Sequence, residues 1–295
     1  MDLSNIVVVP KLSMVQLDMH KSGFDEAALK CKYVYEGKDP EVIFDSHYRQ
    51  LESIEKLRKK FPTSICYREG FSRDVADKAS LIIAAGGDEH LKYVTHYVSN
   101  TPVLGLNTDP KRSRGELLED NIDEALESLE KGNFEIKEET RIEARVNRKP
   151  CMLGMSLFAL RRFSDPFGNF RYKIIFNNQE EVHRITSGLL VYAGNGVDDW
   201  PRGAGKYLQK DYIELKPEDK KLAWVVNEPN GDYKMLTGLI NEGEELNVTC
   251  FKDDSAAAPD AIVEHKVKVD NGDRVSFRIA EVPLRKVKIK ASLNQ

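Results

Sequence analysis

The chain has 295 residues, of which 41% are hydrophobic, enough for a buried core in one large domain or two ordinary ones. The formal net charge is −4 and no long block carries one sign, so the basic patch of a general nucleic-acid-binding protein is missing. The apolar runs are too short to cross a bilayer. We therefore expect neither nucleic acid nor a membrane as a partner.

Apolar runs in the first part of the chain predict strands, and helical spacing of apolar residues predicts helices between them. The predicted strands are residues 6–9, 64–67, 81–84 and 103–106. The predicted helices are residues 41–61, 91–98 and 122–129. Such alternation is typical of a parallel sheet covered by helices. Residues 1–134 are predicted to form a Rossmann-like α/β nucleotide-binding domain.

From about Phe134 the pattern changes to short β-rich segments separated by turn signals such as Asn271-Gly272. Strands are predicted at residues 141–146, 172–176, 189–193, 222–226, 246–251, 265–269, 275–279 and 285–289. The segment 253–260, with three alanines and a proline, is predicted to be a surface loop. Residues 135–295 should form a β-rich, mainly antiparallel domain, whose last strands can return to the first domain.

The four cysteines lie far apart in the sequence. None belongs to a CxxC pair or to a Cys/His cluster at metal-ligand spacing, so neither a disulfide framework nor a structural zinc site is expected. Reduced thiols are typical of cytoplasmic proteins. We expect a cytoplasmic location.

A glycine pair lies at the junction of a predicted strand and a predicted helix, a position that commonly binds ligands. A predicted strand ends in Gly86-Gly87-Asp88 and a helix begins at once. Backbone without side chains can approach a phosphate closely, and amide groups at a helix N-terminus point towards it. Asp88 then lies at the carboxyl end of a strand, where open α/β sheets bind ligands. A tight turn in which Asp88 is the helix N-cap would have the same sequence. The motif alone therefore leaves open both the ligand-binding and the structural interpretation.

A longer pattern adds to this motif. The run AAGGD, followed by PVLGLNTDPKRSRG, resembles the nucleotide-binding core of NAD kinases, and its NTDP-x-RS-x-G form is most similar to the mitochondrial and plant NADH-kinase-like branch. Downstream, SGLLVYAGNGVDDW, LAWVVNEP and VDNGDRVSFRIAEVPLRKVKI resemble segments of the family's β-rich domain. The similarity spans residues 6–289 and implies the NAD kinase fold.

The resemblance implies roles for particular residues. Gly86, Gly87 and Asp88 would form the GGD core, with Asp88 as the base toward the acceptor hydroxyl or as the organiser of the nucleotide phosphates. Asn107 and Asp109 would face the dinucleotide cleft. The second loop, placed against the acceptor nucleotide, would consist of Gly194, Asn195 and Gly196.

The resemblance also implies a reaction, the ATP-dependent phosphorylation of a hydroxyl of NAD or NADH in an interdomain cleft, with Mg²⁺ neutralising the transferring group. Polyphosphate is an alternative donor. The metal ligands are not identified: Asp88 with Asp198 and Asp199 is one candidate set, although adjacent acids in a loop are commonly just solvated. NAD kinases commonly assemble through the β-rich domain, so we expect a homodimer or homotetramer.

The sequence departs from the family pattern at three places, one of which is the second loop, where Asn195 and Val197 replace a Thr and a Ser. The family motif is normally GGDGT, whereas here Glu89 and His90 follow Asp88. The Asn-Glu pair that holds the acceptor's adenine and ribose in the family should fall near residues 154–157, where it is absent. Three interpretations remain open: an NAD(H) kinase, a relative that phosphorylates a smaller polyol, sugar or nucleoside, and a nucleotide-binding sensor without catalysis.

Overall fold

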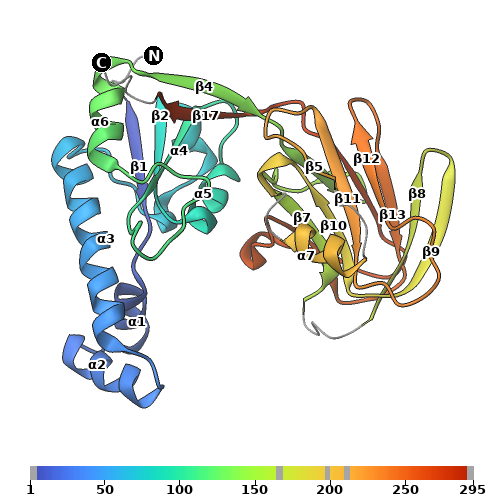
Figure 1. The fold of residues 1–295 in the computed structure, drawn as a ribbon, viewed down its shortest axis with the longest axis horizontal. Helices are drawn as coiled ribbons and strands as arrows, with labels where there is room; N and C mark the ends of the chain where they lie inside the picture. The colour runs from blue at the N-terminus through green and yellow to red at the C-terminus, as the bar shows by residue number, and fades with distance from the viewer. Residues whose placement is uncertain (1–4, 164–168, 197–199, 209–212, 291–295) are drawn as a thin grey trace. The chain divides into compact units, whose positions relative to one another are not determined.

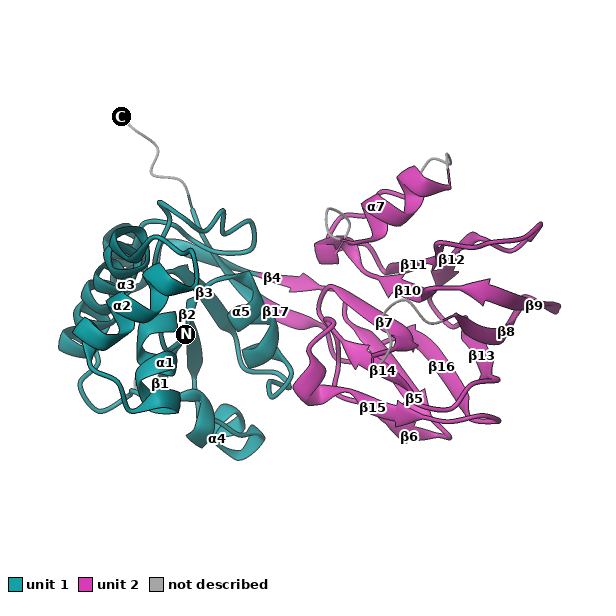
Figure 2. Cartoon of the chain, turned by 90° about the horizontal axis from the view of Figure 1, so that it is seen from below, with its two compact units in different colours: residues 1–136, 286–295 teal, residues 137–285 magenta. Residues whose placement is uncertain are grey.

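The computed structural model describes residues 5–163, 169–196, 200–208 and 213–290. The chain divides into two compact units, residues 1–136 with 286–295 and residues 137–285 (Figure 2). Residue 134, where the sequence analysis put the domain boundary, is the first residue of strand β4 (Phe134–Glu139). The two units are described one after the other.

The first unit is built on a five-stranded sheet (Figure 1). Its strands, in spatial order, are β1 (Ile6–Pro10), β2 (Leu81–Gly86), β3 (Val103–Asn107), β17 (Leu284–Ile289) and β4. The first four pair in parallel. Every residue of β2 and β3 is buried, as expected for parallel strands covered on both faces. The predicted α/β class of this unit is confirmed.

Six helices connect and cover these strands. They are α1 (Met14–Ser22), α2 (Glu26–Tyr35), α3 (Pro40–Lys60), α4 (Arg73–Lys78), α5 (Asp88–Thr95) and α6 (Ile122–Lys131). Asp39 caps α3 and Pro40 occupies its first turn, a combination that favours helix initiation. The sequence analysis did not predict α1 and α2, which pack at one end of α3 (Figure 1) around Val15, Leu29 and Phe44.

The second unit contains two six-stranded sheets. One has the order β12-β11-β10-β7-β14-β15 and the other the order β6-β5-β16-β13-β8-β9. The strands are β5 (Ile142–Val146), β6 (Lys149–Pro150), β7 (Leu157–Arg162), β8 (Phe170–Phe176), β9 (Gln179–Thr186), β10 (Gly188–Tyr192), β11 (Lys221–Asn227), β12 (Thr237–Asn241), β13 (Leu246–Cys250), β14 (Ser255–Pro259), β15 (Val267–Val269) and β16 (Arg274–Ile279).

Residues from both sheets of the second unit share one apolar core. Phe158 of β7 meets Phe277 of β16 edge to face, with ring centroids 5.9 Å apart, and Trp224 of β11 is buried in the same cluster. A further helix, α7 (Trp200–Tyr207), contributes Ala204 to a second apolar cluster with Tyr192 of β10. The strand pairings in the described part of this unit are antiparallel, so the predicted β-rich class is confirmed.

Two predictions about local structure are wrong. The expected surface loop at residues 253–260 contains β14, a fully buried strand that pairs with β7 and β15. Alanine is a weak strand former, but the three small side chains fill an interior position between two neighbouring strands, so packing overrides propensity. The strand expected at residues 64–67 is reduced to a single bridge between Ile65 and Val8.

The cysteines are free, and no helix in the described part of the chain is long and apolar enough to span a membrane. Burial raises the pKa of the Cys250 thiol to about 12 and that of Cys151 to about 11. Both thiols are therefore protonated at neutral pH and poorly nucleophilic.

Candidate functional site

The GGD motif lies at the carboxyl edge of the first unit's sheet. Gly86 ends β2 and pairs in register with Asn107, which ends β3. Gly87 is the N-cap of α5, which begins at Asp88. The structure thus brings Gly86, Gly87, Asp88 and Asn107 together at the edge where parallel sheets hold their ligands.

Asp88 holds the loop that follows β3. Its carboxylate accepts hydrogen bonds from the backbone N–H groups of Glu116, at 3.2 Å, and Leu117, at 3.1 Å. Asp88 is the first residue of α5 and not its N-cap, so the interpretation of the motif as an Asp-capped turn is wrong. Each carboxylate oxygen has more than one acceptor position. The half-buried Asp88 can therefore accept a further hydrogen bond from a ligand hydroxyl.

The two glycines of the motif meet different surroundings. A Cβ atom on Gly86 would lie 2.9 Å from His90 Cβ, whereas the nearest atom to a Cβ on Gly87 would be Ser113 Oγ, at 3.5 Å. Packing against His90 therefore requires glycine at position 86. The fold makes no such demand at position 87, which is consistent with a glycine kept for the close approach of a ligand.

His90 is a packing residue in this unit. It is buried and its Nε2 donates to the Val9 carbonyl oxygen at 2.8 Å. Burial lowers the pKa of His90 to about 4, so the ring is neutral at physiological pH. His96 is also buried.

The depressed pKa of His90 makes stability depend on pH. The ordinary pKa is 6.5 and the folded value about 4, so unfolding favours proton uptake below pH 6.5. The stability from this residue is complete above pH 6.5 and is lost as the pH falls toward 4, which amounts to about 2–3 kcal/mol at pH 4.5. His90→Gln removes the titration. Urea unfolding at pH 7.5 and 4.5 should show a smaller loss of stability in this variant than in the wild type.

His47 and His183, whose pKa values are also lowered by burial, titrate in the same direction. Part of the pH dependence will therefore remain in His90→Gln. An equal pH dependence in the two proteins would show that His90 is already accessible to protons in the folded state.

Glu89 replaces a glycine of the family motif, and its charge is partly compensated. Its carboxylate lies 3.0 Å from Lys92 Nζ, one helical turn further along α5. The glutamate side chain is largely exposed while that of Lys92 is buried. This i,i+3 ion pair partly neutralises the negative charge of Glu89.

Asn107 organises the segment after β3. Its buried side-chain amide donates to the carbonyl oxygen of Ser113, at 3.0 Å, and to Asp120 Oδ1, at 2.7 Å. Its Oδ1 accepts from the backbone N–H of Asp109 at 3.1 Å. The side chain is therefore engaged within its own loop.

Asp109 ties the same loop to helix α3. Its buried carboxylate accepts from Arg49 Nε at 2.7 Å and from Ser46 Oγ at 2.5 Å. Arg49 also pairs with Asp45. Asn107 and Asp109, expected to face a dinucleotide, thus hold the conformation of the loop that approaches Asp88.

The second glycine-rich loop belongs to the other unit. Gly194–Gly196 forms a 3₁₀ turn after β10, and Asn195 Nδ2 donates to Glu139 Oε2 at 2.8 Å. A Cβ on Gly194 would lie 2.2 Å from backbone atoms of Lys216, and one on Gly196 would lie 2.3 Å from the Ser156 carbonyl oxygen. Close backbone packing therefore requires both glycines. The candidate metal ligands Asp198 and Asp199 lie outside the described residues.

Asp260 is a buried residue that the sequence analysis missed. Its carboxylate accepts from the backbone N–H groups of Met155 at 3.0 Å, Ser156 at 2.7 Å and Leu157 at 3.0 Å, and from Ser156 Oγ at 2.6 Å. These are the residues near which the family's Asn-Glu pair was expected. The backbone amides at this position therefore donate to a carboxylate that lies about a hundred residues away along the chain.

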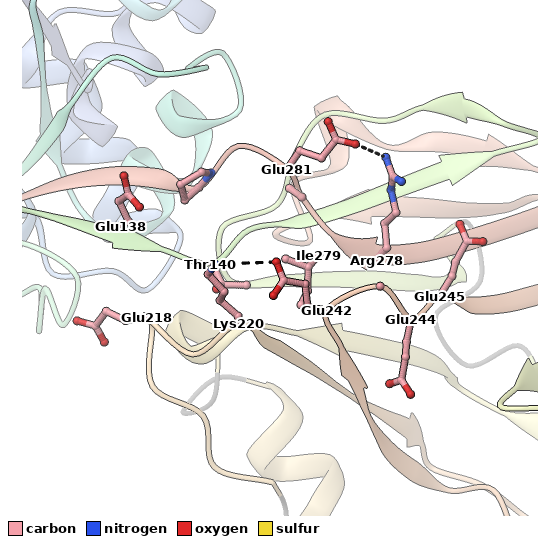
Figure 3. A pocket seen from close by; sticks show the side chains of 13 residues that line it. Glu138, Thr140, Glu218, Lys220, Glu242, Glu244, Glu245, Arg278, Ile279 and Glu281 are labelled. Atoms are coloured by element: carbon pink, nitrogen blue, oxygen red, sulfur yellow. Dashed lines mark hydrogen bonds and ion pairs between the residues drawn. The ribbon is translucent and has the colours of Figure 1, made fainter.

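A pocket of about 640 Å³ in the second unit does not contain the predicted residues (Figure 3). Among the described residues that line it, the basic ones are Lys220 and Arg278, and Arg278 Nη2 already pairs with Glu143 at 2.8 Å. The acidic lining residues are Glu138, Glu218, Glu242, Glu244, Glu245 and Glu281. Like charges would repel a polyphosphate here, so this pocket is a poor site for a nucleotide.

The described residues contain no cluster of side chains arranged as a metal cage. No group of three or more His, Cys, Asp or Glu side chains in that part of the chain is placed to hold a metal ion. Both oxygens of Asp88 and of Asp109 already accept hydrogen bonds. Mg²⁺ commonly binds through one or two carboxylates together with water and substrate phosphates, which is a different arrangement from a protein cage.

Comparison of the sequence with known proteins gives distant similarities, and no protein-family model matches. "Probable NADH kinase" of Oryza sativa subsp. japonica is 24% identical over 277 residues, covering 80% of this chain and 78% of that protein. "NAD kinase 2, mitochondrial" of Rattus norvegicus is 25% identical over 265 residues, covering 83% of this chain. The chain spans only 60% of the rat protein's length.

Two solved structures share the fold. An NAD kinase from Archaeoglobus fulgidus, in complex with ATP, has a TM-score of 0.60 at 16% identity, covering 82% of this chain and 90% of that chain. Yeast NADH kinase, complexed with NADH, has a TM-score of 0.63 at 13% identity, covering 78% of this chain and 68% of that chain. The fold implied by the sequence resemblance is confirmed.

Proposed function

We propose that this chain, which fits a divergent NAD kinase-like family, transfers the terminal phosphate of ATP to a hydroxyl of NAD or NADH and so forms NADP or NADPH. The observation that carries the proposal is the position of Asp88 beside Gly87 at the carboxyl edge of the parallel sheet. It stands in a fold shared with two solved structures, one in complex with ATP and the other with NADH.

The residues at this edge can serve phosphoryl transfer. The acceptor hydroxyl oxygen attacks the terminal phosphorus, the bond from phosphorus to the bridging oxygen breaks, and ADP leaves with the electron pair of that bond. Asp88 accepts the hydroxyl proton. The backbone N–H groups of Glu116 and Leu117 fix the orientation of its carboxylate. The N-terminus of α5, with no side chain at Gly87, can approach the phosphates.

Three further properties belong to the same proposal. Mg²⁺ would enter with the nucleotide phosphates, consistent with the absence of a protein cage among the described residues. The β-rich unit would carry a homodimer or homotetramer contact, by analogy with the family. The four free cysteines support a cytoplasmic location.

An acceptor panel tests the proposal. The purified protein is incubated with Mg²⁺ and either ATP or polyphosphate, together with NAD, NADH or a set of polyols, sugars and nucleosides, and the products are identified by mass spectrometry. NADP or NADPH is the expected product. Product formed only from a smaller acceptor, or nucleotide binding without any product, would instead support the two alternatives.

Gly87→Ala separates the structural from the functional need for glycine. The nearest atom to the added methyl group is 3.5 Å away, and losing glycine at an N-cap costs about 1 kcal/mol. We expect a small change in melting temperature but a turnover at least about tenfold lower, because the methyl group occupies the space through which a phosphate approaches. Gly86→Ala, which clashes with His90, is the matched control that destabilises the fold. Full turnover in Gly87→Ala would exclude close phosphate contact there.

A further inference from the structure

A second, smaller pocket lies in the first unit, away from the GGD motif in sequence. It has a volume of about 220 Å³ and is lined by residues of α1, α3 and the loop after β3, including Ser13, Ser46, His47, Gln50 and Arg112. This is below the usual size of a pocket for a drug-sized ligand. A single small group fits it better than a nucleotide does.

His47 is one of the residues that line this pocket. The residue is only 4% exposed, and its Nδ1 lies 2.7 Å from Ser13 Oγ. The buried Ser13 hydroxyl already accepts from the backbone N–H of Gln16, and its own proton has no other acceptor among the described residues, so it donates to Nδ1. A neutral His47 then carries its proton on Nε2. Within the described chain, Nε2 makes no hydrogen bond.

The surroundings of His47 favour an anion. Arg112 uses one nitrogen to donate to the Val42 carbonyl oxygen at 2.6 Å and makes no ion pair in the described part of the chain. The nine-residue helix α1 begins at Met14, on the wall of the pocket, and presents its positive end there. The first helical turn contains no acidic residue.

The carboxylates nearest to His47 do not belong to the residues that line the pocket. The carboxylate of Asp109 accepts hydrogen bonds from Ser46 Oγ and from Arg49 Nε. Glu26, whose charge acts on His47, accepts a hydrogen bond from the Tyr48 hydroxyl at 2.7 Å. The pocket therefore presents a buried N–H donor, a guanidinium and a helix N-terminus, with no free carboxylate among its lining residues.

We propose that this pocket binds a phosphate group, either as free inorganic phosphate or at the end of a polyphosphate chain. A tetrahedral oxyanion can accept hydrogen bonds from an imidazole N–H, from a guanidinium and from those first-turn amides of a helix that its cap leaves free. The site is additional to the transfer chemistry assigned to Asp88, and binding there does not require that chemistry.

Two substitutions at His47 separate binding from structure. His47→Asn keeps a polar group near the position of Nδ1, so it can retain the contact with Ser13, but it removes the donor at Nε2. His47→Gln places its amide near the position of Nε2 and gives up the contact with Ser13. A purely structural role predicts the larger defect in His47→Gln, whereas phosphate binding predicts it in His47→Asn.

Arg112→Gln and Arg114→Gln form a second pair. They remove the same charge from the same loop, but the Arg114 side chain is 89% exposed, pairs with Glu116 and does not line the pocket. Binding of inorganic phosphate and of tripolyphosphate is measured by isothermal titration calorimetry without NAD. A lost hydrogen bond to an anion should weaken binding about fivefold or more in His47→Asn and Arg112→Gln. His47→Gln and Arg114→Gln should stay within about twofold.

Tighter binding of tripolyphosphate than of phosphate identifies a chain end as the ligand, and equal binding identifies free phosphate. The proposal is overturned if the wild type binds neither probe, or if His47→Asn and Arg112→Gln both bind as the wild type does. Asp88→Asn is included because a loss of phosphate binding in that variant would place the anion at the GGD edge instead. Absence of NADP formation would contradict the proposed function without affecting these results.

Discussion

Asp88→Asn is expected to lower turnover about a hundredfold or more, because the amide cannot accept the proton of the acceptor hydroxyl. The same change affects stability. The side-chain NH₂ group faces the backbone N–H of either Glu116 or Leu117, both of which now donate to the carboxylate. One donor loses its acceptor, at a cost of about 1–3 kcal/mol. Turnover with saturating NAD and ATP is measured well below the melting temperature of the variant.

Asp120→Ala is the matched control for this measurement. Asp120 accepts from Asn107 Nδ2 at 2.7 Å and so supports the same loop without touching Asp88. If Asp88 acts only by holding the loop, the two variants should lose similar activity for a similar loss of stability. If Asp88 acts on the acceptor, Asp120→Ala should keep turnover within about tenfold of the wild type. Full activity in Asp88→Asn would contradict the assignment of Asp88 as the group that accepts the hydroxyl proton.

Asp260→Ala is expected to give the largest loss of stability. Its carboxylate accepts hydrogen bonds from three backbone N–H groups and one hydroxyl, all of them buried. Each orphaned donor costs about 1–3 kcal/mol, so we expect a loss of about 4 kcal/mol or more. Asp260 also has a positive φ of 50°, which Asp and Asn tolerate better than alanine.

Asp260→Asn separates these contributions. Its Oδ1 can keep the three hydrogen bonds to Ser156 and Leu157, so the loss should be about 1–3 kcal/mol. Asp253→Ala is the surface control, because Asp253 is exposed and accepts one recorded hydrogen bond, from Asn271 N. Urea unfolding followed by tryptophan fluorescence reports on the second unit through buried Trp224. A loss below 1 kcal/mol in Asp260→Ala would mean that water replaces the carboxylate.

Elements with a strong hydrophobic pattern were predictable from the sequence. The buried run of β2 and the apolar face of α3 that contains Ile54 and Leu57 each follow from the pattern of a single segment. The strand-to-helix turn at Gly87 was equally local, because a glycine pair interrupts an apolar run there.

Features that depend on distant partners were not predictable. The sequence of β14 predicts a loop because alanine has a low strand propensity. The strand is stabilised by its pairing with β7 and β15. Asp260 accepts hydrogen bonds from backbone amides that lie more than a hundred residues earlier in the chain. For the same reason, the sequence did not reveal that Asp109 is tied to Ser46 and Arg49. The GGD motif identified the sheet edge, but only the structure identified what each side chain contacts.

The position of β17 affects the order in which the chain can fold during synthesis. β17 lies between β3 and β4 in the sheet, so β4 has no neighbouring strand until β17 has left the ribosome. All of residues 137–285 are translated in that interval, which at about 5–20 residues per second lasts roughly 7 to 30 seconds. Throughout it, the edge of β3 is unpaired and open to other strands. The unit that is translated first is therefore the last to be completed, because its sheet waits for a strand that follows the whole second unit in the sequence.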